Sequence, residues 1–221
     1  MGKTAALLLA DRALWLPESK TLVAGDLHFG KVNHFRRSGL PVPLAANVRN
    51  AERLIDLINA WEPRRMLFLG DLFHSAYNDD WEVIGHIVKQ FSACSFELVH
   101  GNHDILSDQQ YERKGIRVLE QERIDGLLFT HEPLERRAIP AGQINLAGHL
   151  HPAARLVGRG RQSLTLPCFW QSANQLILPA FGTFTGLAVI RPEEQDTVYV
   201  IVENQIMELR PPALRSPSEV S

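Results

Sequence analysis

Residues 65–71 read Arg65-Met66-Leu67-Phe68-Leu69-Gly70-Asp71, an apolar run that ends in a glycine and a carboxylate. A short apolar run closed by a turn residue predicts a buried β-strand. The same order recurs where Val23-Ala24-Gly25 precedes Asp26 and where Phe96-Glu97-Leu98-Val99 precedes His100-Gly101-Asn102. Ligand sites in open α/β sheets collect at the carboxyl ends of strands. The stretch therefore predicts a sheet with a polar site along one edge.

Two further polar segments follow apolar runs later in the chain. Leu127-Leu128-Phe129-Thr130 leads into His131, and Ile144-Asn145-Leu146-Ala147 leads into Gly148-His149-Leu150-His151. Alternate residues of an extended segment face the same side, so His149 and His151 can point together. Five such segments, built from oxygen and imidazole groups, predict a metal site. Its candidate ligands are Asp26, His28, Asp71, Asn102, His131, His149 and His151.

The size of this ligand set indicates how many metals it holds. A structural zinc ion takes four ligands, so the set suits two divalent ions that share one carboxylate. Imidazole and carboxylate ligands fit manganese, iron or zinc, and we expect manganese. Two ions roughly 3.5–4 Å apart stabilise both the attacking and the leaving oxygen in phosphoryl transfer.

Several of these residues also have ordinary structural interpretations. Asp71 could cap a following helix, and Asn102 could be a turn residue after Gly101. The constellation favours metal bridging for Asp71 and an amide oxygen ligand for Asn102. His103 lies one residue further on and is the natural general acid for a leaving oxygen. Asp104 could orient that imidazole or cap a helix ahead of Ile105, and the two interpretations stay level.

Basic residues follow three of the metal motifs. Lys31, Arg36 and Arg37 come after the first motif and are the candidate substrate-binding residues. Arg136 and Arg137 follow His131, and further arginines follow His151. Such residues are usually solvated surface, but clusters on one face would suit a phosphate backbone.

Length and composition fit one domain. The chain has 221 residues, so residues 1–210 are expected to form a single domain and residues 211–221 a disordered tail rich in proline and serine. The net charge of −2 gives no global signature of nucleic-acid binding. Two cysteines without CxxC spacing indicate a reduced, cytoplasmic protein. No targeting segment or membrane-spanning stretch is evident, and we expect no contact with a membrane.

The expected elements change in character along the chain. The N-terminal runs 5–9, 13–16 and 22–24 predict a small meander, and apolar spacing over 48–61 predicts a helix stopped by Pro63. Residues 81–91 predict a second helix, with Val83, Ile84, Ile87 and Val88 as its buried stripe. After Tyr111 the chain is β-rich, with hairpin signals at Asp125-Gly126, 158–160 and 203–204.

The order of the motifs resembles the calcineurin-like metallophosphoesterase superfamily. The pattern is Asp-x-His, Gly-Asp, Gly-Asn-His-Asp, His and Gly-His-x-His, and it spans Asp26 to His151. One departure is Leu72-Phe73-His74 after Gly-Asp, where many members carry an extra acidic residue. The resemblance implies an α/β (α+β) fold, a four-layer α/β/β/α sandwich of two mixed β-sheets flanked by helices. It also implies that one metal takes Asp26, His28 and His151, that the other takes Asn102, His131 and His149, and that Asp71 bridges them.

Segments outside these motifs resemble one bacterial subfamily, the ligase-associated DNA damage response endonucleases (PdeM). They include 26–31, 39–43, 166–170 and 178–186. This resemblance implies a DNA endonuclease acting in repair, with a DNA ligase, a helicase and an exonuclease as candidate partners. A small-molecule phosphoesterase acting on cyclic nucleotides or phosphomonoesters is the alternative. A scaffold without catalysis ranks last, because all seven ligands and His103 are present.

Overall fold

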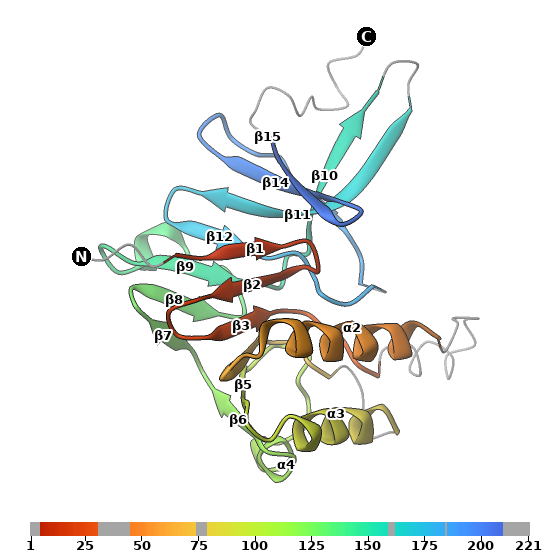
Figure 1. Ribbon diagram of the computed structural model, residues 1–221. Helices are drawn as coiled ribbons and strands as arrows, with labels where there is room; N and C mark the ends of the chain where they lie inside the picture. The colour runs from red at the N-terminus through yellow and green to blue at the C-terminus, as the bar shows by residue number, and fades with distance from the viewer. Residues whose placement is uncertain (1–4, 31–44, 74–78, 159–161, 184, 210–221) are drawn as a thin grey trace.

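The first of two β-sheets comes from the N-terminal half of the chain. The computed structural model describes residues 5–30, 45–73, 79–158, 162–183 and 185–209. The first three strands, β1 to β3, form the predicted antiparallel meander, and β3 to β6 run parallel. The strands lie in numerical order: β1 (Leu7–Leu9), β2 (Ala13–Leu16), β3 (Thr21–Ala24), β4 (Arg65–Leu69), β5 (Ser95–Val99) and β6 (Ile116–Leu119) (Figure 1).

Among the described residues the second sheet has nine strands and is also mixed. Its main path runs β13-β10-β11-β12-β9-β8-β7, and β14 pairs with both β11 and β15. β8, β9 and β12 run parallel, whereas the hairpins that surround them are antiparallel. The strands are β7 (Glu122–Ile124), β8 (Leu127–Thr130), β9 (Ile144–Ala147), β10 (Pro152–Val157), β11 (Ser163–Ser172), β12 (Gln175–Ile177), β13 (Ala188–Val189), β14 (Thr197–Val202) and β15 (Gln205–Leu209).

The alternation of side chains along the strands joins the layers. On β4, Met66 and Phe68 face the helices, while Leu67 and Leu69 face the second sheet. Leu67 and Leu69 share a core cluster with Phe129 and other residues of the second sheet. Each such side chain, fully buried, stabilises the fold by roughly 1.5–3 kcal/mol. The strand that leads into Asp71 is therefore held from both sides.

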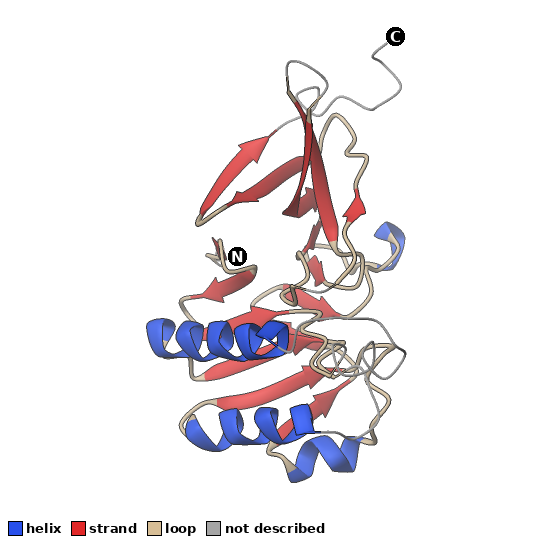
Figure 2. Ribbon diagram, turned by 90° about the vertical axis from the view of Figure 1, so that its right-hand side faces the viewer, coloured by secondary structure: helices blue, strands red, loops and turns tan. Residues whose placement is uncertain are grey.

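The α-helices cover the outer face of the first sheet, whereas the short 3-10 helix η1 (Arg136–Ala138) follows β8 of the second sheet. α2 (Ala45–Trp61) and α3 (Asp79–Gln90) lie side by side there, and α4 (Asp108–Arg113) packs beside β6 (Figures 1 and 2). The buried stripe predicted for α3 is wrong at Val83, which is 39% exposed, because Trp81 occupies the core-facing position instead. No described helix combines the length and apolar character needed to cross a bilayer.

The predicted sandwich of two mixed sheets with helices is confirmed. Within the described residues the α-helices α2 and α3 belong to the first sheet's outer cluster, while the outer face of the second sheet carries a cluster of strand residues that includes Cys168 and Val198. The predicted hairpins form β7–β8, β10–β11 and β14–β15. Asp125 and Gly126 both have positive φ, as a two-residue hairpin turn requires. The predicted tail lies outside the described residues.

Candidate metal centre

The polar segments follow strands of both sheets. Asp26 follows β3, Asp71 follows β4 and Asn102 comes shortly after β5 in the first sheet. His131 follows β8, and His149 and His151 lie between β9 and β10 in the second. Since β3, β4 and β5 run parallel, as do β8 and β9, their carboxyl ends bring the segments to one region.

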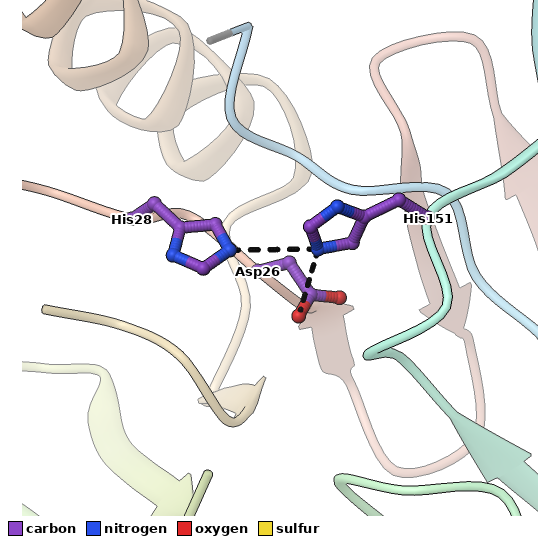
Figure 3. A group of neighbouring side chains, drawn as sticks. All are labelled: Asp26, His28 and His151. Atoms are coloured by element: carbon purple, nitrogen blue, oxygen red, sulfur yellow. Dashed lines mark hydrogen bonds and ion pairs between the residues drawn. The ribbon is translucent and has the colours of Figure 1, made fainter. Parts of the chain in front are cut away.

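One group of candidate ligands consists of Asp26, His28 and His151. The Nε2 atoms of His28 and His151 are 3.4 Å apart, and Nε2 of His151 lies 3.4 Å from Oδ1 of Asp26 (Figure 3). The ligand atoms of all three lie within 4.8 Å of one another. Oδ1 of Asp26 is buried and has no hydrogen-bond partner among the described residues. A buried carboxylate oxygen without a hydrogen-bond partner is suited to binding a cation.

A second group surrounds His131. Its Nε2 atom lies 2.8 Å from Oδ1 of Asn102 and 3.1 Å from Nδ1 of His149. Two imidazole nitrogens and an amide oxygen thus converge on a small volume, as the ligands of one divalent ion do. The residues proposed for two metals therefore fall into two groups, each brought together by the fold.

Asp71 lies between the two groups. Its Oδ2 atom is 3.6 Å from Nε2 of His28, and its Oδ1 atom is 3.5 Å from Nε2 of His131. The carboxylate is buried, with a side-chain exposure of 3%. One oxygen is thereby directed toward each group, which is the geometry a bridging carboxylate needs.

Carbonyl oxygens behind the histidines orient two of the imidazoles. Nδ1 of His131 donates to the carbonyl of Leu69 over 2.9 Å, and Nδ1 of His151 donates to the carbonyl of Gly186 over 3.1 Å. A carbonyl can only accept, so each Nδ1 carries the proton and each Nε2 is left with a free lone pair. Such second contacts fix the tautomer and ring orientation of metal-binding histidines.

Five of the seven candidate ligands adopt a left-handed backbone conformation. The φ angles lie between 49° and 67° for Asp26, His28, Asp71, His149 and His151. Non-glycine residues rarely adopt this region, and they cluster there at functional sites. Asp26 and His28, spaced i, i+2, thus reach the same group from a turn instead of a strand. His149 and His151, expected to point together, instead reach different groups.

Two glycines permit the close approach of the ligand loops. A Cβ atom on Gly101 would lie 2.5 Å from Oδ1 of Asp71, and one on Gly148 would lie 2.5 Å from Oδ2 of Asp26. Either side chain would collide with a buried carboxylate. The glycines that precede Asn102 and His149 are therefore part of the geometry of the site.

Asp104 is buried and binds the loop that carries Asp71. Its carboxylate accepts the backbone N–H groups of Asp71 at 2.8 Å and Leu72 at 2.9 Å, and the hydroxyl of Tyr111 donates to it at 3.0 Å. Gly101 and Phe73 also donate to it. Burial raises the pKa of Asp104 despite these hydrogen bonds. Ser107, not Asp104, is the N-cap of α4, so the helix-cap interpretation of Asp104 is wrong.

His103 lies exposed beside His28 of the first group. Its side chain is exposed, its ring centroid lies 5.9 Å from that of His28, and its backbone N–H donates to Oδ1 of Asp71 over 2.9 Å. A ring in this position is accessible to a substrate bound at the two groups.

The structure describes only some of the basic residues that follow the metal motifs. Lys31, Arg36 and Arg37 lie outside the described residues. Arg136 pairs with Glu193 at 3.6 Å, and Arg137 pairs with Glu135 at 2.7 Å. The arginine cluster after His131 is therefore partly neutralised by neighbouring carboxylates.

Comparison with known proteins identifies the family. The calcineurin-like phosphoesterase model matches residues 19–157. The crystal structure of Pseudomonas putida nuclease MPE superposes with a TM-score of 0.77 and 27% identity, covering 93% of this chain and 96% of that chain. The phosphoesterase Yfce from E. coli shows 14% identity and a TM-score of 0.48, covering 86% and 98%. A search of curated proteins finds no match.

The matched region accounts for more than half of the chain and contains every candidate ligand from Asp26 to His151. Enzymes of this family work with two metal ions. The resemblance seen in the order of the motifs is confirmed by the family match and by the fold. The chain therefore belongs to the calcineurin-like phosphoesterase family and is a metal-dependent phosphoesterase.

Proposed function

We propose that this protein is a two-metal phosphodiesterase whose substrate is DNA. The position of the Asp71 carboxylate, with one oxygen toward His28 and the other toward His131, is the observation that carries the proposal. The similarity of this chain to the P. putida nuclease supports a nucleic acid as the substrate, since the two chains align over nearly their whole lengths.

The proposed ligand assignment follows the two groups. One metal takes Asp26, His28 and His151, the other takes Asn102, His131 and His149, and Asp71 joins both. We propose manganese, with iron and zinc as alternatives, because the donors are imidazole nitrogens and hard oxygens. When bound, such a pair lowers the pKa of a water and stabilises the attacking and leaving oxygens of the phosphoryl group.

The remaining residues act on the substrate or on the ligand loops. We propose that His103 is the general acid, because it is exposed beside His28 and can protonate the departing oxygen. Asp104 supports catalysis by holding the backbone of residues 71–73 in place. Lys31, Arg36 and Arg37 are proposed to bind the phosphate backbone.

The cellular setting is part of the proposal. By resemblance, the protein acts in the cytoplasm in DNA repair, with a ligase, a helicase and an exonuclease as partners. The two free, buried cysteines, Cys94 and Cys168, suit a reducing compartment.

A small-molecule phosphoesterase is the second candidate. It is favoured by the ion pairs of Arg136 and Arg137 with glutamates. These pairs reduce the positive charge that the two arginines could offer to a long polyanion such as DNA. A compact diester or monoester would need the metals and His103 but no extended basic face.

An activity panel separates the two candidates. The metal-free protein would be reloaded with manganese and given supercoiled plasmid, single-stranded DNA, a cyclic nucleotide, a phosphomonoester and a chromogenic bis-ester. We expect cleavage of DNA and of the bis-ester, and loss of both on chelation. Turnover of the cyclic nucleotide or the monoester without any DNA cleavage would instead establish the small-molecule enzyme.

A further inference from the structure

A late segment of the chain passes along the first group of ligands. We call residues 178–188 the strap; residue 184 within it lies outside the described residues. The strap begins where Leu178 donates its backbone N–H to Ala147 at 2.8 Å. It ends where Ala188 donates to the carbonyl of His151 at 3.0 Å. Both of these partners lie next to or within the ligand segments of the second sheet.

Between these ends the strap contacts the loop that carries Asp26. The backbone N–H of Phe181 donates to Gly25 at 2.9 Å, and that of Gly182 donates to Asp26 at 3.0 Å. Further along, the Gly186 carbonyl accepts Nδ1 of His151. The strap thus fixes the backbone of one ligand and the imidazole of another, and both belong to the same group.

Two arginines from distant parts of the chain hold the strap. Arg12, in the turn between β1 and β2, donates to the carbonyls of Ala180 and Gly182, each at 3.3 Å. Arg53, on α2, donates to the carbonyl of Phe181, and its guanidinium carbon lies 4.0 Å from the centroid of that phenyl ring. Three successive carbonyls therefore accept from arginine.

The two cations stand close enough to repel one another. Burial, and then the charge of Arg12, lower the pKa of Arg53 to about 10, which leaves it protonated at neutral pH. Asp11 offsets part of this repulsion. Two half-buried arginines directed at neutral carbonyls are a costly way to gain stability alone. Their placement is explained better by a need to fix the strap.

We propose that Arg12 and Arg53 are positioning residues for the metal held by Asp26, His28 and His151, acting through the strap. The proposal rests on the two-metal function proposed above. It implies that loosening the strap weakens this metal position more than the other. The described contacts of His131 and Asn102 do not involve the strap, and His149 is linked to it only through its backbone N–H, which donates to Oδ2 of Asp26. Loss of an outer contact of this kind typically lowers metal affinity by about 10–100-fold.

The test is a manganese titration of Arg53→Met, Arg53→Lys and Arg12→Met. Metal binding is monitored by calorimetry and by electron paramagnetic resonance. We expect Arg53→Met and Arg12→Met to keep one tight site and to weaken the other by about 10–100-fold. The spectrum of a coupled manganese pair should then give way to that of an isolated ion. Arg53→Lys keeps a cation over the Phe181 ring and should recover part of the affinity.

Arg65→Met is the matched control. Arg65 is also a half-buried arginine, but it pairs with Glu97 and Glu122 at the start of β4, at the end of that strand away from Asp71. This variant should lose stability and keep both metal sites. If Arg53→Met and Arg65→Met lower the melting temperature alike and both retain two tight sites, the arginines are structural and the proposal is overturned.

Gly182→Ala offers a variant that leaves both arginines intact. A Cβ atom there would lie 2.6 Å from the carbonyl oxygen of Leu27, so the strap must move away from the ligand loop. We expect the same selective loss of one manganese site. Unchanged binding at both sites would contradict the proposal. A wild-type protein that binds fewer than two ions would instead refute the two-metal function itself.

Discussion

The carboxylate of Asp104 accepts the backbone N–H of Asp71 over 2.8 Å, so one buried acid holds the main chain of another. The same group also binds Leu72 and Phe73. The residue that would bridge two metals is therefore held in its left-handed conformation by a partner 33 positions later in the chain.

Replacing Asp104 with Asn should destabilise the protein. The amide NH₂ would face either the N–H of Asp71 or that of Leu72, both of which now donate to a carboxylate. Each buried N–H left without an acceptor costs about 1–3 kcal/mol. Chemical denaturation of the metal-free protein measures the loss, with exposed Asp108→Asn as the control. Equal stability of the two variants would show that the contacts of Asp104 contribute little.

Asp71→Asn should impair metal binding more than any other single ligand change. Both groups would lose the charge of their shared carboxylate. The affinity for metal should therefore fall by more than about 100-fold, which is the largest loss expected when only a hydrogen-bond partner of a ligand is removed. Metal analysis after gel filtration gives the stoichiometry, and hydrolysis of a bis-ester gives the rate. Two tightly bound ions and near-normal turnover would rule out a bridging role.

His103→Ala should bind metals normally and lose on the order of 10²–10⁴ in turnover on DNA, the usual contribution of a general acid. The loss should be smaller for a nitrophenyl ester, because nitrophenolate leaves without a proton. Exposed His100→Ala, three residues earlier, serves as the control. An equal loss on both substrates would indicate that His103 positions the phosphate instead.

Changing Lys31, Arg36 and Arg37 together to Ala should weaken DNA cleavage and spare a small bis-ester. Each lost phosphate contact should reduce the log–log salt slope by about 0.7–0.9. A control variant removes the same charge at exposed Lys20, Arg64 and Lys89 and should leave the salt slope unchanged. Parallel losses on DNA and the bis-ester would mean that the three residues support the site's structure.

The thiols should be inert in the folded protein. Burial raises the pKa of Cys94 to about 11 and that of Cys168 to about 12, against an ordinary value of about 8.5. The folded state thus keeps protons that the unfolded state loses, so this stabilisation is present below about pH 8.5 and declines as the pH rises further. Labelling with a thiol reagent at pH 8 should be slow until denaturant is added. Rapid labelling of the native protein would contradict this burial.

The sequence predicts the strands well, and it points to a set of candidate ligands, because both signals are local. Asp71 stands directly after an apolar run, so its strand and its place at the sheet edge can be inferred from neighbouring residues. The contacts of Arg12 with Ala180 and Gly182 join positions 168 and 170 residues apart, and no local pattern marks them. The prediction for Val83 was wrong for a related reason. Its apolar character suits a core, but Val83 is 39% exposed and Trp81 is buried on the core-facing side of the helix.

The geometry of the ligands is harder to infer than their identity. His28 follows Asp26, and His151 follows His149, at the i, i+2 spacing of an extended segment. Both histidines nevertheless adopt a left-handed backbone conformation, which non-glycine residues disfavour. The role of Asp104 depends on Tyr111 and on residues 71–73, which only the tertiary structure brings together. The positions of the strands can be predicted from the sequence, whereas the contacts that support the ligands cannot.

The proposed role of the strap also has a consequence for the order in which the parts of the site are synthesised. The loop carrying Asp26 is made early, but the backbone groups of Phe181 and Gly182 that bind it are made more than 150 residues later. A nascent chain paused before this point has all seven candidate ligands and lacks the segment that contacts two of them. Since domains fold as their last contacts become available, we expect this site to assemble only after Gly182 has been synthesised.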